Sequence, residues 1–247
     1  MTIWAIADLH FSFGVPDKEM GLFGENWTDH HIKLKESWKA QIQPDDLVLI
    51  AGDISWALKL KDVIPDLEWI DALPGTKVMI RGNHDYWWGS PTKIREILPP
   101  SVHIIHNDVY RWKDFEIGGV RLWDSDFNFN EFIEFRKNPK AKEVKEVKDD
   151  HKIYQRELNR LEMSLKGFEG PKEKRIVMTH YPPVDAKMTP SPASELLEQY
   201  EVPVCVFGHL HNVRDGSLPF GEARGVRYVL TSCDYLNFKP IKIMDHA

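Results

Sequence analysis

Short runs of apolar residues, many of them β-branched, recur along the chain, and five of these runs end in polar residues. The five segments are 2–10 (TIWAIADLH), 46–53 (DLVLIAGD), 77–85 (KVMIRGNHD), 175–180 (RIVMTH) and 202–211 (VPVCVFGHLH). Unbroken apolar runs of this length are typical of strands that are covered on both faces. The pattern therefore predicts buried strands with polar residues at their carboxyl ends.

Helical spacing follows the first two of these runs. Between Thr28 and Ile42, side chains that suit a buried face recur every three or four positions. A second helix is predicted to begin at Pro65 and to continue through Leu73, where the following Pro-Gly pair ends it. The first third of the chain is thus predicted to be a β-α-β-α-β unit.

Later segments have the pattern of antiparallel structure. The runs 102–112 and 115–125 are separated by two residues and predict a hairpin, and the segment 225–244 is strand-like as well. Parallel units at one end of the chain and antiparallel ones at the other predict an α/β (α+β) fold of two mixed β-sheets, packed as a sandwich and flanked by helices. At 247 residues we expect a single domain, 1–247.

A segment rich in Lys and Glu, at about 130–175, is expected to be a charged helical insertion. Within it a narrow apolar stripe recurs at steps of three and four, typical of a long helix. The stripe consists of Val144, Val147, His151, Tyr154, Leu158, Leu161 and Leu165. The favoured interpretation of this helix is a surface helix on the body of the protein. A contact in a homodimer is the second interpretation, and a cap over the substrate is the third.

Composition narrows the function classes. The net charge of −6 argues against a broad surface for long nucleic acids, so extensive nucleic-acid binding is not expected. Cys205 and Cys233, the two cysteines, stand in apolar runs and are expected to be buried thiols of a reducing compartment. Neither a signal peptide nor a membrane-spanning run is recognisable, so we expect a cytoplasmic protein without membrane association.

Polar residues of metal-binding type stand at the end of each of the five runs. In DLH and GHLH two such residues are two positions apart, so their side chains point to the same side of an extended chain. Ligands of open α/β sheets bind at the carboxyl ends of the strands, where we expect these side chains to meet. The seven candidate metal ligands are Asp8, His10, Asp53, Asn83, His180, His209 and His211.

Seven ligands exceed the needs of one tetrahedral ion and suit two divalent ions that share a bridging carboxylate. Oxygen and imidazole ligands without a thiolate favour Mn, Fe or Zn, without deciding among them. Two ions about 3.5–4 Å apart can stabilise both the attacking and the leaving oxygen in phosphoryl transfer. Two divalent ions, the two aspartates and a bridging hydroxide together leave the centre with about one positive charge. This local charge can attract a phosphate although the protein as a whole is acidic.

The ordered set DLH, GD, GNHD, TH and GHLH resembles the signature of the calcineurin-like metallophosphoesterase superfamily, in order and complete between residues 8 and 211. The resemblance implies a two-sheet sandwich flanked by helices. It implies a first ion held by Asp8, His10 and His211, a second held by Asn83, His180 and His209, and a bridging Asp53. A bridging hydroxide would then attack phosphorus in line.

The same resemblance implies that His84 contacts the phosphate and protonates the leaving oxygen. Asp85 would accept a hydrogen bond from this imidazole and orient it. The chain reads GDISWA, so it lacks the Arg of the protein Ser/Thr phosphatase motif GDxVDRG, and His84 stands where enzymes acting on the lipid A precursor UDP-diacylglucosamine commonly have Arg. The predicted function is therefore that of a small, bacterial-type phosphoesterase that hydrolyses small phosphomonoesters or phosphodiesters.

Two alternatives remain open. One is a nucleotide or nucleic-acid phosphodiesterase, and the other is a metal-binding scaffold whose partner docks on the charged helix. Three aromatic residues, Tyr86, Trp87 and Trp88, follow His84 and are expected to cover the edge of the site, with stacking on a nucleobase as the alternative. Arg81 is a further candidate substrate contact, although an Arg at a strand end is often a surface ion pair.

Overall fold

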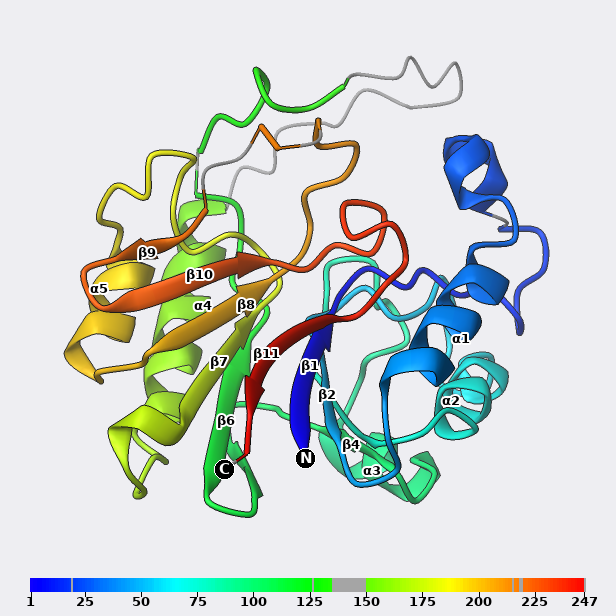
Figure 1. Cartoon of the computed structure of the whole chain (residues 1–247), viewed down its shortest axis with the longest axis horizontal. Helices are drawn as coiled ribbons and strands as arrows, with labels where there is room; N and C mark the ends of the chain where they lie inside the picture. The colour runs from blue at the N-terminus through cyan, green and yellow to red at the C-terminus, as the bar shows by residue number, and fades with distance from the viewer. Residues whose placement is uncertain (19, 126, 135–149, 215, 218–219, 247) are drawn as a thin grey trace.

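Two β-sheets lie face to face in the middle of the molecule, and helices cover their outer faces (Figure 1). This computed structural model describes all residues except 19, 126, 135–149, 215, 218–219 and 247. The predicted fold class, two mixed sheets flanked by helices, is confirmed. Both chain ends lie at the same edge of the molecule, where β1 and β11 pair (Figure 1).

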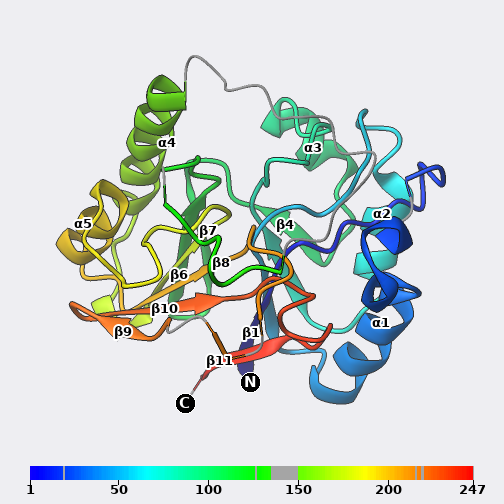
Figure 2. The same ribbon diagram turned by 90° about the horizontal axis from the view of Figure 1, so that it is seen from above.

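The first sheet has the strand order β11-β1-β2-β3-β4, with β11 antiparallel to its neighbour and the others parallel. Its strands are β1 (Thr2–Ile6), β2 (Leu47–Ile50), β3 (Thr76–Met79), β4 (Val102–Ile104) and β11 (Ile241–Asp245). Its outer face is covered by α1 (His30–Gln41), α2 (Ile64–Asp71) and α3 (Pro91–Ile97) (Figure 2).

The second sheet has the order β5-β6-β7-β8-β10-β9, with a parallel centre and an antiparallel strand at each edge. Its strands are β5 (Val109–Trp112), β6 (Phe115–Val120), β7 (Arg175–Thr179), β8 (Val204–Phe207), β9 (Glu222–Ala223) and β10 (Val226–Leu230). The helices α4 (Asp150–Leu165) and α5 (Pro192–Gln199) cover its outer face, and the short 3₁₀ turns are η1 (Met20–Phe23), η2 (Glu25–Trp27) and η3 (Lys172–Lys174).

The apolar runs of the sequence are buried on both faces, as their pattern predicted. In β2, Leu47 and Leu49 belong to the core between the sheets, whereas Val48 and Ile50 belong to the core under the helices. All four side chains are buried. A strand covered on both faces has no solvent side, which is why its sequence does not alternate.

The predicted hairpin is formed only in part. β5 and β6 pair antiparallel around Lys113 and Asp114, but the beginning of the run 102–112 forms β4, which belongs to the other sheet. The chain leaves the first sheet at residues 106–108, where Asn107 has a left-handed φ of 63° and the carboxylate of Asp108 accepts the N–H of His106 (2.7 Å). This polar turn divides one apolar run between two sheets.

Helix α4 lies on the second sheet through the predicted apolar stripe. Leu158, Leu161 and Leu165 are buried against that sheet, while His151 is exposed. Val144 and Val147 lie outside the described residues. The three leucines of the stripe are therefore covered by the chain itself, which favours the surface-helix interpretation; the dimer contact and the substrate cap remain predictions.

The two sheets are joined by hydrogen bonds at the carboxyl end of β1. The N–H of Ala7 donates to Thr231 O (2.7 Å), and the N–H of Cys233 donates to Ala7 O (3.0 Å). Ala7 thus connects the first sheet to the segment that follows β10. The next residue is Asp8, so this junction fixes the start of the candidate site.

Candidate metal centre and active site

The seven predicted metal ligands lie together at the carboxyl ends of the strands. Each stands within a few residues after the end of its strand: β1, β2 and β3 in the first sheet, β7 and β8 in the second. The ligand atoms of Asp8, His10 and His211 lie within 4.8 Å of one another, and so do those of Asp8, Asp53 and His180. The packing of two sheets therefore brings five separate motifs to one place.

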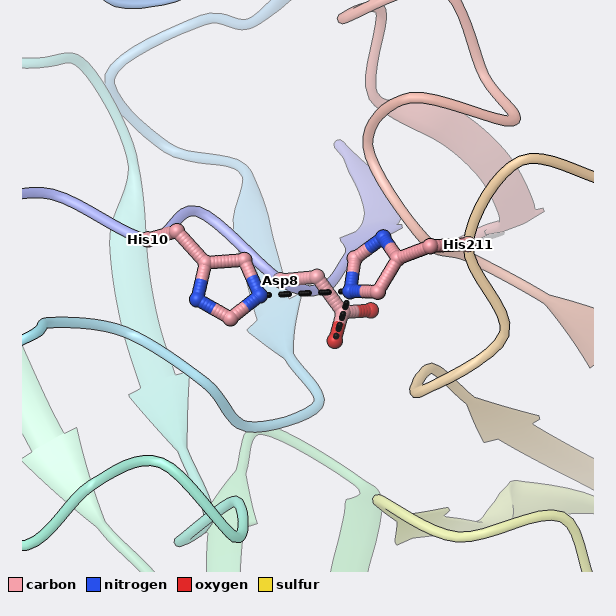
Figure 3. A group of neighbouring side chains, drawn as sticks. All are labelled: Asp8, His10 and His211. Atoms are coloured by element: carbon pink, nitrogen blue, oxygen red, sulfur yellow. Dashed lines mark hydrogen bonds and ion pairs between the residues drawn. The ribbon is translucent and has the colours of Figure 1, made fainter. Parts of the chain in front are cut away.

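The first group of ligands is shown in Figure 3. The Nε2 atoms of His10 and His211 are 3.2 Å apart, and His211 Nε2 lies 3.5 Å from Asp8 Oδ1. Asp53 Oδ2 lies 3.7 Å from His10 Nε2. Asp8, His10 and Asp53 are buried, and the side chain of His211 is 28% exposed, so the group opens toward solvent on the side of His211.

The second group shares Asp53 with the first. The same oxygen, Asp53 Oδ2, lies 3.4 Å from His180 Nε2. Asn83 Oδ1 lies 2.6 Å from His180 Nε2 and 3.0 Å from His209 Nδ1. Asp53 is therefore placed between the two groups, as a bridging carboxylate must be.

The backbone at the ligands is held in an uncommon conformation. Four of the seven, Asp8, His10, Asp53 and His209, have left-handed φ values between 48° and 72°. Residues other than glycine adopt this region rarely, and such strain persists only where the surrounding structure imposes it. The tertiary structure thus maintains an unfavourable backbone conformation that places these side chains at the site.

Two of the motif glycines make the close approach possible. A Cβ atom on Gly82 would lie 2.0 Å from Asp53 Oδ1, and a Cβ atom on Gly208 would lie 2.4 Å from Asp8 Oδ2. Each glycine belongs to one motif and leaves space for the carboxylate of another. Any larger residue at these positions would displace a ligand.

Electrostatics at the site call for a bound cation. Burial raises the pKa of Asp8 to about 6 despite the nearby His211 and His180. Burial also acts to raise the pKa of Asp53, but His180 and the other imidazoles hold it well below the usual range. Burial opposes charge on His180 and His211, yet neighbouring carboxylates raise the pKa of each to about 9. Protons on these imidazoles balance the buried carboxylates, and a metal ion would replace them.

The spacing of the donor atoms fits metal coordination. Two donors at about 2.1 Å from a common ion are about 3.0–3.4 Å apart at octahedral or tetrahedral angles. The separations of 3.0, 3.2, 3.4 and 3.5 Å given above fall in or next to this range, whereas Asn83 Oδ1 to His180 Nε2 (2.6 Å) is shorter and His10 Nε2 to Asp53 Oδ2 (3.7 Å) is longer. The thiol of Cys233 is turned to the carbonyl of Asp8 (2.9 Å), so the described donors are oxygens and imidazoles. The residues present fit hard or borderline divalent ions.

The predicted hydrogen bond from His84 to Asp85 is not formed. The buried carboxylate of Asp85 instead accepts four other N–H groups: those of Ile54 (2.9 Å), Ser55 (3.1 Å) and Gly82 (2.7 Å), and the indole of Trp87 (3.0 Å). Through these hydrogen bonds the carboxylate ties the loop after β2 to the loop after β3. Asp85 is a positioning residue for the loops rather than for the imidazole.

His84 lies over the ligand groups and is held by a hydrogen bond from its backbone N–H and by packing of its imidazole ring. Its N–H donates to Asp53 Oδ1 (2.8 Å), and its ring packs against Trp56 with centroids 4.6 Å apart. His84 Nδ1 is buried without a hydrogen-bond partner among the described residues. Burial lowers the pKa of His84, although the charge of Asp53 opposes this shift. The imidazole therefore keeps a ring nitrogen for which the described residues supply no partner.

The three aromatic residues after Asp85 differ in position. Trp87 and Trp88 are 3% and 4% exposed and pack in the core under the helices, whereas Tyr86 is 56% exposed. Stacking of either tryptophan on a nucleobase is therefore wrong as a prediction, because both rings are packed in the core. Tyr86 is the one of the three with an exposed ring, which lies 6.2 Å from that of His84. Arg81 is half-buried.

Sequence reasoning missed three residues around the ligands. Asp234 Oδ1 lies 2.9 Å from His211 Nδ1, Trp56 stacks on His10 at 5.0 Å, and Tyr181 packs on His209 at 4.1 Å. Asp234 also accepts the N–H of Asn212 (2.8 Å). A signal for Asp234 was present, because the segment VRYVLTSCD is one more apolar run that ends in a carboxylate.

An α/β sandwich with this donor set at its strand ends has the arrangement of a metal-binding protein. The sequence matches the family model of the calcineurin-like phosphoesterases over residues 1–213. The chain therefore belongs to the calcineurin-like phosphoesterase family, and the resemblance drawn from its motifs is confirmed. The description of this family names phosphoesters as the substrates of its members.

Solved structures with the same fold come from distant organisms. A protein of unknown function from Aquifex aeolicus aligns with a TM-score of 0.50 and 15% identity, over 98% of this chain and 95% of the other. Phosphopantetheinyl hydrolase (PptH) from Mycobacterium tuberculosis aligns with a TM-score of 0.53 and 16% identity, over 96% and 90%. GAP50, the anchor in the inner membrane complex of Plasmodium, aligns with a TM-score of 0.50 and 13% identity, over 95% and 72%. At these identities the similarity concerns the fold alone.

Two phage proteins are similar in sequence over a shorter stretch. The Gene 66 protein of Mycobacterium phage D29 is 34% identical over 83 residues, which is 34% of this chain and 40% of the phage protein. The Gene 66 protein of Mycobacterium phage L5 is 35% identical over 82 residues, or 33% and 39%. The match thus spans about two fifths of the length of these relatives. Among the described helices, none has the length and apolarity that crossing a membrane requires.

Proposed function

We propose that this protein hydrolyses a phosphomonoester or phosphodiester of a small molecule at a centre of two divalent ions. The observation that carries the proposal is the convergence of seven ligands in two groups that share Asp53 Oδ2, with donor separations of 3.4 and 3.7 Å from that oxygen to an imidazole of each group. Asp8, His10 and His211 would hold one ion, and Asn83, His180 and His209 the other. Bound ions would polarise the phosphoryl oxygens and lower the pKa of water.

The roles of the remaining residues follow from their positions. His84 faces the ligand groups and has an imidazole nitrogen without a partner, so we assign to it contact with the phosphate and protonation of the leaving oxygen. Trp56 packs on the rings of both His10 and His84 and thereby fixes the position of the metal ligand His10 relative to the acid His84. Asp85 and Asp234 act as positioning residues, the first for two loops and the second for His211.

A small substrate suits the surface around the centre. A cavity of about 170 Å³ lies beside His209, lined by Tyr181, Phe127, Phe129 and other residues. This cavity can hold part of a small compound, and the net charge of −6 supports a small phosphorylated substrate over a long nucleic acid. The two buried free cysteines support a reducing, cytoplasmic location.

The proposal is tested by metal content and by turnover. Purified protein is expected to contain about two divalent ions per chain, by metal analysis, and to hydrolyse members of a panel of phosphomonoesters, phosphodiesters and nucleotides with Mn²⁺, Mg²⁺ or Zn²⁺. His84→Ala is expected to keep both ions and to lose about a hundredfold or more in kcat, with a larger loss on alkyl than on p-nitrophenyl esters, because a poor leaving group depends more on protonation. His103→Ala, on β4, is the matched control.

Full activity in protein freed of metal would contradict this function. The competing possibility is a scaffold, and the fold that this chain shares with the anchor GAP50 is compatible with either. A scaffold would bind its ions and show no turnover on any substrate of the panel. His84→Ala would then alter nothing measurable, whereas the proposed hydrolase loses activity.

A further inference from the structure

A second polar cavity, of about 280 Å³, lies beside the candidate metal centre and is not explained by the proposed reaction. It is built at the carboxyl ends of β3, β4 and β6 and is closed on one side by α4. Its lining includes three arginines, Arg81, Arg121 and Arg160, together with Glu157 and Trp88. These residues come from three separate segments, the loop after β3, the end of β6 and α4, and meet only in the folded chain.

The cavity carries an excess of positive charge. Glu157 is 1% exposed, and its Oε1 atom lies 2.7 Å from Arg160 Nη1 and 3.3 Å from Arg121 Nη2. Arg156, outside the lining, reaches the same oxygen at 3.7 Å. One buried carboxylate thus holds several guanidinium groups in place, and the three lining arginines exceed it by two charges. Burial, together with the charge of Arg81, lowers the pKa of Arg121 although Glu157 opposes this.

Several hydrogen-bond donors of the cavity have no acceptor. Arg81 Nε, Arg121 Nε and Trp88 Nε1 are buried and have no hydrogen-bond partner among the described residues. Trp88 is 4% exposed, and the side chain of Arg121 is 10% exposed. Buried donors without partners cost free energy, so they indicate an acceptor that binds from outside. Three donors around an excess of positive charge fit an oxyanion.

The cavity is directly connected to the metal ligands through the backbone. Arg81 precedes the ligand Asn83 by two residues, which limits their Cα separation to about 7 Å. The carbonyl of Arg121 accepts the N–H groups of His180 (3.1 Å) and Tyr181 (3.0 Å). The walls of the cavity are therefore continuous with the segments that carry the ligands Asn83 and His180.

We infer that Arg81, Arg121 and Arg160, with the indole N–H of Trp88, form a subsite for a second phosphate group of the substrate. The inference rests on the proposed function and names its substrate class, a small compound with two phosphates. A terminal phosphate carries about −1.5 to −2 charges at pH 7, which matches the excess of two, whereas a carboxylate carries one. Guanidinium forks bind phosphate oxygens in pairs, and the indole supplies one more donor.

The first test compares substrates that differ only in the second phosphate. Alkyl monophosphates and α,ω-alkanediol bisphosphates of the same chain lengths are hydrolysed by the full chain with its metals, and the phosphate released is measured. We expect kcat/KM for the best bisphosphate to exceed that of its monophosphate at least about tenfold. Arg81→Gln is expected to remove most of this preference, and Arg81→Lys to retain part of it, because Lys keeps the charge without the fork.

Arg95→Gln is the matched control. Arg95 pairs with Asp108 (2.6 Å) on the surface, outside the cavity, and its loss should leave the preference as in the wild type. An ω-carboxyalkyl phosphate in place of the bisphosphate distinguishes the two oxyanions. A preference as large for the carboxylate as for the phosphate would overturn the assignment of a second phosphate.

The second test measures binding without turnover. Calorimetric titration of Asp53→Asn with the best bisphosphate is compared with the same titration of the double variant Asp53→Asn, Arg81→Gln, and we expect about tenfold weaker binding in the latter. Failure of the proposed function alone would leave a wild type that hydrolyses nothing but binds the bisphosphate through Arg81. Equal kcat/KM for both substrate series, with equal binding to both variants, would overturn the subsite while leaving the hydrolase.

Discussion

The loops of the first sheet supply all the oxygen ligands of the candidate metal centre, whereas the loops of the second sheet supply only imidazoles. Asp8, Asp53 and Asn83 follow β1, β2 and β3, and the second sheet adds its histidines after β7 and β8. Buried carboxylates need positive charge nearby, and in the second sheet neighbouring carboxylates raise the pKa of His180 and His211, although burial opposes this, while burial lowers the pKa of His209. Neither sheet contains a site by itself, so the centre is a product of their packing.

The two sheets also differ in how they hold most of their ligands. Left-handed backbone sets the direction of Asp8, His10 and Asp53 in the first sheet, and of His209 in the second. The other two histidines of the second sheet have hydrogen-bond partners: the carboxylate of Asp234 faces His211, and the carbonyl of Ala51 faces His180 at 3.0 Å. Support by local conformation therefore predominates in the first sheet, and support by partners from distant segments in the second.

The largest effect is expected from Asp53→Asn, which removes the shared charge on the side of the first sheet. The amide keeps the shape but cannot balance two cations, so the expected loss is several kcal/mol of transition-state stabilisation, or about a thousandfold in kcat/KM. Steady-state hydrolysis of an aryl phosphate and metal analysis measure it. Asp46→Asn, at the other end of β2, is the control, because Asp46 contacts Trp4 and Thr2 far from the site.

A centre that retained its metals and its rate in Asp53→Asn would show that the oxygens of the first sheet are not shared between two ions. The comparison between the sheets would then fail at its central residue. Loss of activity in Asp46→Asn as well would assign the effect to the fold of β2 rather than to the charge.

The second prediction addresses the imidazoles. Asp234→Asn removes the carboxylate that orients His211 and leaves the ligand itself in place. Carboxylate partners of metal-bound histidines typically contribute tenfold to a hundredfold in metal affinity, and we expect a loss in that range. Competition with a chelator measures the affinity.

Asp234→Asn should affect only the ion that His211 would hold. The other ion would be held in part by His180, whose partner is the backbone carbonyl of Ala51 and is unchanged by this substitution. Two equally weakened ions, or none, would contradict the difference in support that the structure shows. Asp245→Asn, a surface carboxylate on β11, serves as the control for a general change in charge.

These contrasts also explain how much the sequence could predict. The ligands were recognisable because each one ends an apolar run, and strand and strand end are local patterns. The division of the run 102–112 between two sheets was not recognisable, since it depends on which sheet each half can cover. The partner of Asp85 could not be predicted either, because Ile54 and Ser55 approach it only after β2 and β3 have paired.

The burial of Trp87 and Trp88 is a similar case. Beside His84 in the sequence, both rings were candidates for substrate contact, and the turn at Asp85 directs them into the core instead. The sequence shows which residues are neighbours along the chain, but the direction of a side chain in an irregular loop follows from tertiary contacts.

The third prediction tests the backbone support of the first sheet. Asp85→Asn leaves one acceptor oxygen and puts an amide N–H₂ against N–H donors that the carboxylate had satisfied. Buried donors without acceptors cost about 1–3 kcal/mol, so we expect the free energy of unfolding to fall by that amount in urea denaturation of the intact chain. Asp71→Asn, whose carboxylate accepts the N–H of Ser101 at a half-buried position, should cost less.

Unchanged stability in Asp85→Asn would show that the loops after β2 and β3 hold their conformation without this carboxylate. The left-handed conformation of Asp53 would then be maintained by other contacts.

The smallest effect is expected at Tyr86, which has a counterpart in the second sheet. Tyr181 is 8% exposed and packs on the ligand His209, whereas Tyr86 is 56% exposed and lies at the edge of His84. An exposed ring can stack on a flat leaving group, so Tyr86→Ala is expected to lower kcat/KM about threefold to tenfold for aryl or nucleoside phosphates. Tyr86→Phe keeps the ring and should keep the rate. An equal decrease for alkyl phosphates would mean that Tyr86 supports His84 rather than the substrate, and both sheets would then use their tyrosine in the same way.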